Sequence, residues 1–363
     1  MDSRLPKTIK GSATRKQEQV VDQIVALARQ YGAGMKLPTV VELSKSLGVT
    51  VSTVDRSLGR LEEMGIVRRK RGSGIYVSSQ IDQKRIGLVF GRNVFGSGSS
   101  PFYRMLIQCC EQRALRHNEA FSFYLDTPQL GRDEENDIHH DLADALSRGR
   151  LDGILVASKR SPEQDRLLRS YGLPMVVLSA NTSGYGLVGF DMEFFLEQTL
   201  CVLKERGCES IGFISTRPYQ REVFEKVTKR EGVTVDADWV KCLPGPDIIS
   251  PDRYEAEGRR LMGALHEANS GRMPDGIIIA DDMLARGACD EFERLGGVVG
   301  GDVKFAVQVN RGCDVLHNWN DRLIQYEMDS NEVVEAMFTE LEALMEQPNE
   351  PRPPVFVKGH LKA

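Results

Sequence analysis

A run of basic residues beside a glycine-containing turn is the part of the sequence best suited to binding a polyanion. The run is Arg68-Arg69-Lys70-Arg71, and Gly72-Ser73-Gly74 follows it directly. Guanidinium and ammonium groups bind phosphate oxygens, and glycine allows the backbone to approach a ligand closely. The sequence therefore predicts a phosphate-binding hairpin in this region.

The spacing of apolar residues around this run predicts the elements that position it. Three segments have helical periodicity, and a threonine stands at the N-cap position of the second and of the third. Two helices, a short turn, a third helix and a basic hairpin are the order of a winged helix-turn-helix, whose third helix enters the major groove of double-stranded DNA. The predicted helices are 18–31, 40–47 and 51–64, and the predicted strands are 66–70 and 75–78.

Polar residues at the start of the third predicted helix are placed to reach base edges. Thr50 has a second interpretation as a helix cap alone, and Arg56 as a solvated side chain. With the hairpin and the segment before the second helix, the predicted DNA-contacting residues are Lys36, Thr39, Thr50, Ser52, Thr53, Arg56, Arg69, Lys70, Arg71, Gly72, Ser73 and Gly74.

The remainder of the chain predicts a larger α/β part. Short apolar strands such as 86–90, 152–156 and 276–280 alternate with helical segments. Such strands belong to parallel sheets covered on both faces, and two successive sets predict two doubly wound lobes with a ligand crevice between them. The predicted domains are 1–78 (winged helix-turn-helix), 79–85 (linker) and 86–363, with lobe one at about 86–186 and 326–347 and lobe two at about 187–325 and 348–359.

Several motifs in the first 80 residues resemble the GntR family of regulators. They are KLPT at 36–39, ELSKSLGVT at 42–50, LGRLEEMGIV at 58–67 and RGSGIYV at 71–77. The sequence departs from the family at Thr39-Val40-Val41, Val51 and Asp55, where the family commonly has Ser-Glu-Arg and flanking arginines. The resemblance implies a DNA-binding module, but the base-reading arginines of the family cannot be carried over.

Residues from about 85 to 330 resemble the effector-binding domain of the LacI/GalR family, which is similar to periplasmic sugar-binding proteins. The motifs include RIGLVF at 85–90, LDGILVAS at 151–158, RGCESIGFIS at 206–215 and DGIIIADDMLARGA at 275–288. The fusion of such a sensor to a GntR-type winged helix is the organisation of arabinose-type repressors.

The second resemblance implies a site for a small-molecule effector, a carbohydrate or a derivative of one. Asp191 and either of Asp281-Asp282 have a second interpretation as helix N-caps, and Phe102 and Tyr103 as core or rim aromatic residues. The loop 91–100 and the pair Asn310-Arg311 are unlike the family, which predicts an altered ligand or the loss of a sugar ligand. The implied effector-binding residues are Phe102, Tyr103, Asp191, Gln220 or Arg221, Asp282, Asn310 and Tyr326 (or its neighbour Glu327).

Charge and composition separate the two parts and exclude several function classes. The first 80 residues carry 14 basic and 7 acidic residues, whereas the rest carries 33 and 45, so a basic module is attached to an acidic body. No nucleophile, cofactor or metal motif is present, and the seven cysteines lack a CxxC pair. His139 and His140 are expected to point in different directions on a helix, so no metal site is predicted.

The leading interpretation is a cytoplasmic homodimer that represses transcription at a pseudo-palindromic operator and responds to an effector bound between its lobes. No membrane span, secretory signal or cofactor is expected, and the chain is not expected to be an enzyme. Two alternatives stay open: a cytosolic solute-binding protein, and a DNA-binding regulator whose second domain only forms dimers.

Overall fold

The N-terminal domain forms around the apolar stripes of its three helices. Ile24, Leu43 and Leu58, one from each helix, are fully buried against one another and against the hairpin. The winged helix-turn-helix that the sequence predicts is therefore confirmed, although the first helix begins at Ser12, six residues before the predicted start at 18. Its elements are α1 (Ser12–Tyr31), α2 (Val40–Leu47), α3 (Val51–Glu63), β1 (Val67–Lys70) and β2 (Gly74–Val77).

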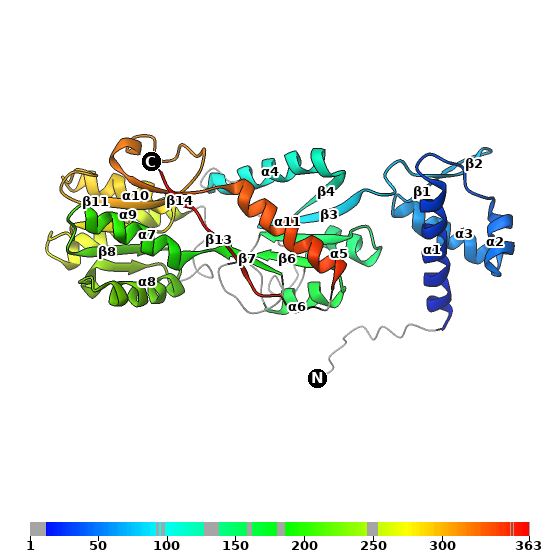
Figure 1. Ribbon diagram of the computed structural model, residues 1–363, viewed down its shortest axis with the longest axis horizontal. Helices are drawn as coiled ribbons and strands as arrows, with labels where there is room; N and C mark the ends of the chain where they lie inside the picture. Colours follow the sequence, from blue (N-terminus) through cyan, green and yellow to red (C-terminus); the bar gives the residue numbers. More distant parts are fainter. Residues whose placement is uncertain are drawn as a thin grey trace.

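Lobe one is a parallel sheet with helices on its faces, next to the winged helix (Figure 1). Its strand order is β13-β7-β6-β5-β3-β4. The strands are β3 (Lys84–Gly91), β4 (Glu119–Asp126), β5 (Gly153–Ala157), β6 (Met175–Leu178), β7 (Leu187–Phe190) and β13 (Val355–Val357). The helices are α4 (Pro101–His117), α5 (His140–Ser147), α6 (Pro162–Ser170) and α11 (Ser330–Glu346).

Lobe two lies at the far end of the molecule and repeats this design (Figure 1). Its strand order is β14-β12-β11-β10-β8-β9, parallel apart from the antiparallel pairing of β14 with β12. The strands are β8 (Ile211–Ser215), β9 (Val240–Cys242), β10 (Gly276–Ile279), β11 (Lys304–Asn310), β12 (Ile324–Met328) and β14 (His360–Leu361). The helices are α7 (Met192–Glu205), α8 (Pro218–Glu231), α9 (Tyr254–Ala268) and α10 (Asp282–Arg294), with short 3-10 turns at Ala237–Trp239 and Asn320–Arg322.

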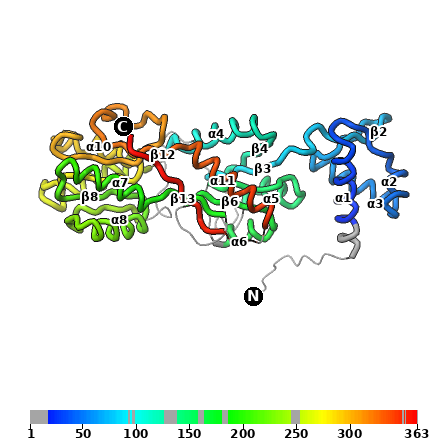
Figure 2. Tube along the Cα trace, in the orientation of Figure 1, coloured from blue at the N-terminus to red at the C-terminus, as the bar shows by residue number. Residues whose placement is uncertain are grey.

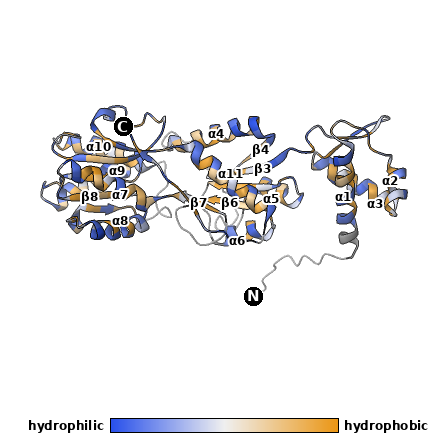
Figure 3. Cartoon of the chain, in the orientation of Figure 1, coloured by the Kyte–Doolittle hydropathy of each residue, from blue (hydrophilic) through white to orange (hydrophobic). Residues whose placement is uncertain are grey.

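Burial follows the hydrophobic pattern that predicted the two lobes. Figure 3 shows largely hydrophobic strands between more polar helices. The four residues of β10 and the five of β8 are buried throughout, as expected of central strands in a parallel sheet. No helix in the described part of the chain is long and apolar enough to cross a membrane.

The chain passes between the lobes at three places within the described residues. It leaves lobe one after β7 and after β13, and it leaves lobe two after β12. Figure 2 shows the last of these segments in red, running from lobe one to the C-terminus in lobe two. The predicted lobe boundaries are wrong at three strands. Residues 187–190 and 355–357 were expected in lobe two but pair in the sheet of lobe one, and 326–328 were expected in lobe one but pair in the sheet of lobe two.

The segment between the winged helix and lobe one is shorter than the predicted linker 79–85. β3 begins at Lys84, and Ile81 is buried in the core of the winged helix. Gln83 donates a hydrogen bond to the carbonyl of Glu119 in lobe one, at 3.3 Å. The polar sequence indicated an exposed segment, but it did not show that the side chains of Ile81 and Gln83 attach this segment to the domains on either side.

The structure describes residues 12–91, 94–95, 99–126, 138–157, 162–179, 186–244, 253–348, 350 and 352–362. Parts of the predicted loop 91–100 therefore lie outside the described residues.

Two glycines allow α9 and α10 to pack at close range. A Cβ atom at Gly258 would lie 2.1 Å from the carbonyl oxygen of Leu284, and one at Gly287 would lie 1.8 Å from that of Glu255. Backbone atoms cannot move aside as the end of a flexible side chain can. This packing fixes the position of the N-terminus of α10, which begins at the edge of lobe two.

Replacing Gly258 by alanine should force α9 away from α10 and lower the free energy of unfolding of lobe two by roughly 1–3 kcal/mol, the usual cost of overpacking. Gly263→Ala is the matched control on the same helix. Its nearest neighbour is a glutamate side-chain oxygen at 3.5 Å, so helix propensity should leave it neutral or more stable by up to ~1 kcal/mol. Equal stability of the two variants by urea denaturation would contradict the close packing.

Candidate functional site

The start of α3 presents the polar side chains that the sequence predicts for DNA contact. Thr50 caps the helix, because its Oγ1 accepts a hydrogen bond from Thr53 N at 3.3 Å. Ser52 and Arg56 are exposed, and the Arg56 guanidinium lies 3.4 Å from Ser52 Oγ. The capping interpretation of Thr50 is thus satisfied, and Ser52 and Arg56 remain as exposed hydrogen-bonding groups without a capping role.

Thr39 has a defined structural role at the start of α2. Its Oγ1 accepts a hydrogen bond from Glu42 N at 3.3 Å, and its own N–H donates to Glu42 Oε2 at 2.8 Å. The two bonds form a capping box. The bond from Thr39 N–H also lowers the pKa of Glu42 below its ordinary value.

The hairpin carries its basic side chains on the face that alternation along a strand predicts. Arg68 and Lys70 are exposed on one face of β1, and Arg71 is exposed at the turn. Lys70 lies 5.1 Å from the ring centre of Tyr76, whose hydroxyl is 2.7 Å from Ser73 Oγ. The turn itself requires positive φ values, 74° at Gly72 and 124° at Gly74.

Lys36 packs against the hairpin. Its strand-like bridge to Tyr76 lays the side chain over Gly74, where a Cβ atom would lie 2.6 Å from Lys36 Cε. The glycine is needed for its positive φ, whereas the Lys36 side chain could move aside for a larger residue.

Arg69 faces the opposite way from its neighbours, into the domain. Its Nη1 lies 2.8 Å from Asp55 Oδ1 and its Nη2 donates to the Asp55 carbonyl at 2.7 Å. Its backbone N–H donates to Glu62 Oε1 at 2.9 Å. Arg69 points to this face because it lies between two outward side chains of a strand, and it joins the hairpin to α3. Its contact with DNA phosphate stays a prediction.

A group of polar residues lies where the strands of lobe two end. Asp281 Oδ1 accepts a hydrogen bond from Leu284 N at 2.9 Å and so caps α10. Asp282 is 2% exposed, and its Oδ2 accepts a hydrogen bond from Asn310 Nδ2 at 2.8 Å. Its Oδ1 is buried and accepts no hydrogen bond from a residue in the described part of the chain. The predicted pair Asp282 and Asn310 is thus brought together at the ends of β10 and β11.

Burial raises the pKa of both adjacent carboxyls, Asp281 and Asp282. Burial, reinforced by the charge of Asp282, raises the pKa of Asp281 to about 7. Burial also raises the pKa of Asp282, against the hydrogen bond from Asn310 that favours its ionised form. Both carboxyls therefore favour the protonated form more than an exposed aspartate does.

Tyr103 of lobe one lies near this acidic group. The charges of Arg217, after β8, and of Asp281 both act on Tyr103 at the start of α4, and burial raises the pKa of Tyr103 above its ordinary value. The same two charges act on buried Tyr254, whose pKa is raised mainly by desolvation. The candidate site therefore lies between the lobes, with Tyr103 from lobe one opposite Arg217, Tyr254 and Asp281 from lobe two.

Sequence reasoning missed Arg217 and chose its neighbours. Gln220 is 5% exposed, and its Oε1 accepts hydrogen bonds from Thr216 N, Thr216 Oγ1 and Arg217 N at 3.0–3.1 Å. Arg221 is exposed and forms an ion pair with Glu225 one turn along α8, at 2.8 Å. Gln220 therefore holds the loop that presents Arg217, while Arg221 points to solvent.

The predicted aromatic residues divide between packing and the candidate site. Phe102 is 8% exposed and packs edge-on against Tyr103 and Phe190, with ring centres 5.5 and 5.8 Å apart. Tyr326 is fully buried against Phe195, and its hydroxyl accepts a hydrogen bond from Gly359 N at 2.8 Å. Complete burial and this packing against Phe195 argue against the predicted contact of Tyr326 with the effector.

The crossings between the lobes are rich in charge. Asp191 caps α7 by accepting from Phe194 N at 3.0 Å, and its other oxygen lies 3.9 Å from Lys358 Nζ at the last crossing. Arg311 forms an ion pair with Asp329 at 2.6 Å and a longer one with Glu327 at 3.5 Å. The capping interpretation of Asp191 is satisfied, and Arg311 is paired at the crossing.

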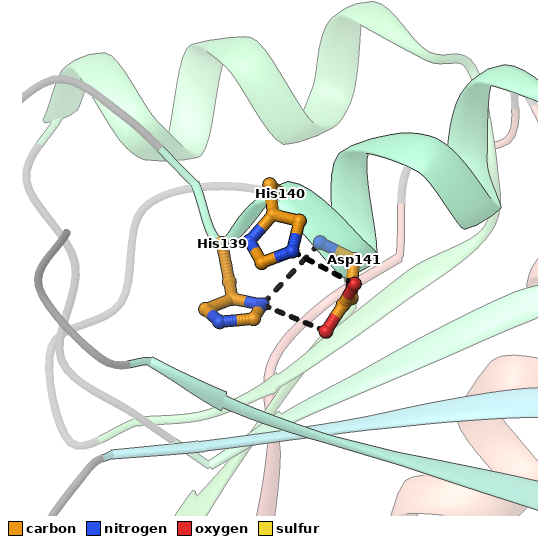
Figure 4. A group of neighbouring side chains, drawn as sticks. All are labelled: His139, His140 and Asp141. Atoms are coloured by element: carbon orange, nitrogen blue, oxygen red, sulfur yellow. Dashed lines mark hydrogen bonds and ion pairs between the residues drawn. The ribbon is translucent and has the colours of Figure 1, made fainter.

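His139 and His140 do face each other, contrary to the sequence prediction. His139 is the N-cap of α5, not part of the helix, so the two rings lie 4.6 Å apart beside Asp141 (Figure 4). Their ligand atoms and that of Asp141 lie within 4.8 Å of one another. His139 Nδ1 accepts the Asp141 N–H at 3.3 Å, and the carboxylate lies 3.1 Å from His140 Nε2. The three side chains are thus held together by contacts among themselves.

Comparison with known proteins finds relatives for both parts of the chain. Residues 16–77 match the family described as bacterial regulatory proteins, gntR family. The HTH-type transcriptional regulator GalR of Streptococcus thermophilus is 23% identical over 277 residues, covering 74% of this chain and 82% of that protein. Both resemblances drawn from the sequence are confirmed.

Solved structures show the same two-lobed fold. A transcription regulator from Lactobacillus plantarum superposes with a TM-score of 0.60 at 18% identity, covering 77% of this chain and 97% of its own. The regulator CelR in complex with cellobiose gives 0.61 at 16%, covering 90% and 99%. The lac repressor dimer bound to operator and an anti-inducer gives 0.60 at 13%, covering 77% and 93%.

The raised pKa of Asp281 predicts a specific dependence of stability on pH. The ordinary value is 3.8 and the folded value is about 7, so folding favours the protonated form. The stabilisation is complete below the ordinary pKa and is lost as the pH rises to about 7. Asn is as good an N-cap as Asp, so Asp281→Asn should melt above the wild type at neutral pH, with a flatter profile between about pH 4 and 7.

The melting temperatures of both proteins against pH, followed by circular dichroism, test this expectation. Asp236→Asn is the matched control, because Asp236 also caps a helix through Asp238 N, at 3.0 Å, but is exposed. Parallel profiles for Asp281→Asn and the wild type would show that burial does not perturb this carboxyl.

Proposed function

We propose that the chain is a homodimeric transcription regulator, a repressor that binds operator DNA through its winged helix and releases it when a carbohydrate effector binds between its lobes. The observation that carries the proposal is the fusion itself. A domain matching the gntR family precedes a two-lobed domain whose fold is shared with transcription regulators. Because it acts on DNA, we place it in the cytoplasm.

The exposed charges of the winged helix support a DNA-binding role. Arg68, Lys70 and Arg71 point outward from the hairpin, and Ser52 and Arg56 are exposed at the start of α3. Phosphate contacts from the hairpin would fix the register, and the start of α3 would read base edges in the major groove. Because two copies related by a two-fold axis present two such helices, the operator would be a pseudo-palindrome.

The chemistry between the lobes supports a polyhydroxylated effector. A sugar hydroxyl can donate to the unpaired Oδ1 of Asp282 and accept from Arg217, while Tyr103 offers both a ring face and a hydroxyl. Solved relatives bound to a sugar include CelR with cellobiose. We therefore assign the effector site to Tyr103, Arg217, Tyr254, Asp281, Asp282 and Asn310.

A thermal-shift screen of the full chain against monosaccharides, disaccharides, sugar phosphates, nucleosides and amino acids tests the effector site. A ligand at 100 times its dissociation constant adds ~2.7 kcal/mol of stability. Arg217→Ala should lose the shift caused by the best hit. Arg221→Ala, which removes an exposed arginine four residues away, should retain it. A flat panel would leave a dimer-forming second domain as the better description.

The assignment of the hairpin predicts a change in the salt dependence of DNA binding. Arg71→Gln should weaken binding to all duplexes and reduce the slope of log affinity against log salt by about 2, because each of the two protomers loses one phosphate contact. Lys229→Gln removes an equal charge from the exposed surface of α8 and should leave the slope unchanged. Fluorescence anisotropy of a labelled duplex at several salt concentrations measures both. Equal slopes for the two variants would show that the hairpin does not contact phosphate.

A further inference from the structure

The winged helix and lobe one meet at the C-terminal end of α3. Arg85, the second residue of β3, donates from Nη1 to the carbonyl oxygen of Met64 at 2.8 Å. Met64 is the C-cap of α3. The last carbonyls of a helix lack intrahelical partners and carry the negative end of its dipole, so a guanidinium is well suited to this position.

The same guanidinium is held firmly within lobe one. Its Nη2 and Nε donate to the two carboxylate oxygens of Asp152 at 2.6 and 3.0 Å, and the backbone N–H of Arg85 donates to Oδ2 at 2.8 Å. Asp152 N–H in turn donates to the carbonyl of Arg85 at 2.8 Å. A bidentate pair of this kind fixes direction as well as distance. The side chain that reaches Met64 therefore cannot rotate freely.

Two further contacts hold the same surfaces together. Arg148, at the end of α5, lies 3.7 Å from a carboxylate oxygen of Glu63 in α3. The position of Gly149 lies against the side chains of Arg60 and Met64, because a Cβ there would be 3.9–4.0 Å from each. The interface thus uses the last turn of α3 and the loop that follows α5.

The connecting segment is also bound on both sides. Ile81 is 4% exposed within the winged-helix core, and Ser78 N–H donates to the carbonyl of Ile66 at 2.9 Å. Gln83 donates to a lobe-one carbonyl. With both ends of so short a segment fixed, the two domains have little freedom to move relative to each other.

We infer that Arg85 is a positioning residue that couples the orientation of α3 to lobe one, so that a rotation of lobe one turns α3 as a rigid extension of it. This inference rests on the proposed function, because it names how the effector signal reaches the DNA-contacting helix. In a dimer, the inference also requires that the lobes set the distance between the two copies of α3, because the segment 79–83 is not a flexible linker.

The first experiment measures tumbling of the full chain without DNA, by ¹⁵N relaxation of a deuterated sample. In the wild type, winged-helix and lobe-one amides should give one rotational correlation time. Arg85→Ala should lose this agreement, with winged-helix amides relaxing as a smaller, faster body. Lys84→Ala, which removes the neighbouring ion pair with Glu342 inside lobe one, should behave as the wild type.

Further variants keep the test decisive if Arg85→Ala fails to fold. Arg85→Lys retains the charge but not the planar fork, so it should also separate the two correlation times. Glu63→Arg places like charges at the Arg148 contact and should loosen the interface, and adding Arg148→Glu should restore it. One correlation time in all folded variants would overturn the inference without affecting the proposed function.

The second experiment measures spacing selectivity on duplexes selected from random DNA by the wild type. Inserting ~5 base pairs between the half-sites turns them to opposite faces of the helix, which repeats every 10–10.5 base pairs. Wild-type affinity should fall at least about 10-fold, whereas Arg85→Ala should lose less than about 3-fold, because a tethered module can still reach its site. Equal losses would overturn the inference, and a failure to select any duplex would count against the proposed function instead.

Discussion

The parallel arrangement of the strands in the two sheets determines where the two-lobed domain can form a ligand site. In a parallel sheet all strands end at one edge, and the chain leaves lobe one after β7 and β13 and lobe two after β12. The carboxyl edges of the two sheets therefore face each other. Tyr103, Arg217, Asp281 and Asn310 all follow strands at these edges, so the topology alone brings them into one region. Their chemistry is local, but their proximity is a property of the fold.

The sequence predicts best where structure is decided locally. The bounds of α2 and α3 follow from Thr39, Thr50 and the glycines after each helix, because capping depends on residues within one turn. The central strands of both lobes were equally clear from their continuous apolar runs. The polarity of 78–83 was informative about exposure, but Ile81 shows that one apolar residue in a polar segment can tie it to a core.

The sequence predictions differ from the structure where distant segments or loop geometry decide the outcome, and at one position where strand alternation was not applied. Arg69 was grouped with its basic neighbours, although strand alternation turns it toward Asp55. Alignment to a resembling family selected Gln220 and Arg221, whereas the loop geometry presents Arg217 four residues before Arg221. Tyr326 and the strands β7 and β13 were misplaced because an apolar strand looks the same in either lobe. The places of β7 and β13 depend on pairing between segments that are distant in the sequence, whereas the orientation of Arg69 follows from alternation along the predicted strand 66–70.

The free energy of each contact decides whether it can couple effector binding to DNA binding. A buried acceptor without a donor, such as Asp282 Oδ1, costs about 1–3 kcal/mol. Coupling between an effector site and a second site is typically 1–3 kcal/mol. A hydroxyl that reaches this oxygen in only one arrangement of the lobes therefore supplies a difference of the required size. An exposed ion pair such as that of Arg221 with Glu225 contributes about 0–1 kcal/mol and is screened by salt. In the proposed function, a neutral polyhydroxylated ligand would therefore obtain most of its difference in binding free energy between the two lobe arrangements from the buried Asp282 carboxyl. The exposed ion pairs on the surface would contribute less.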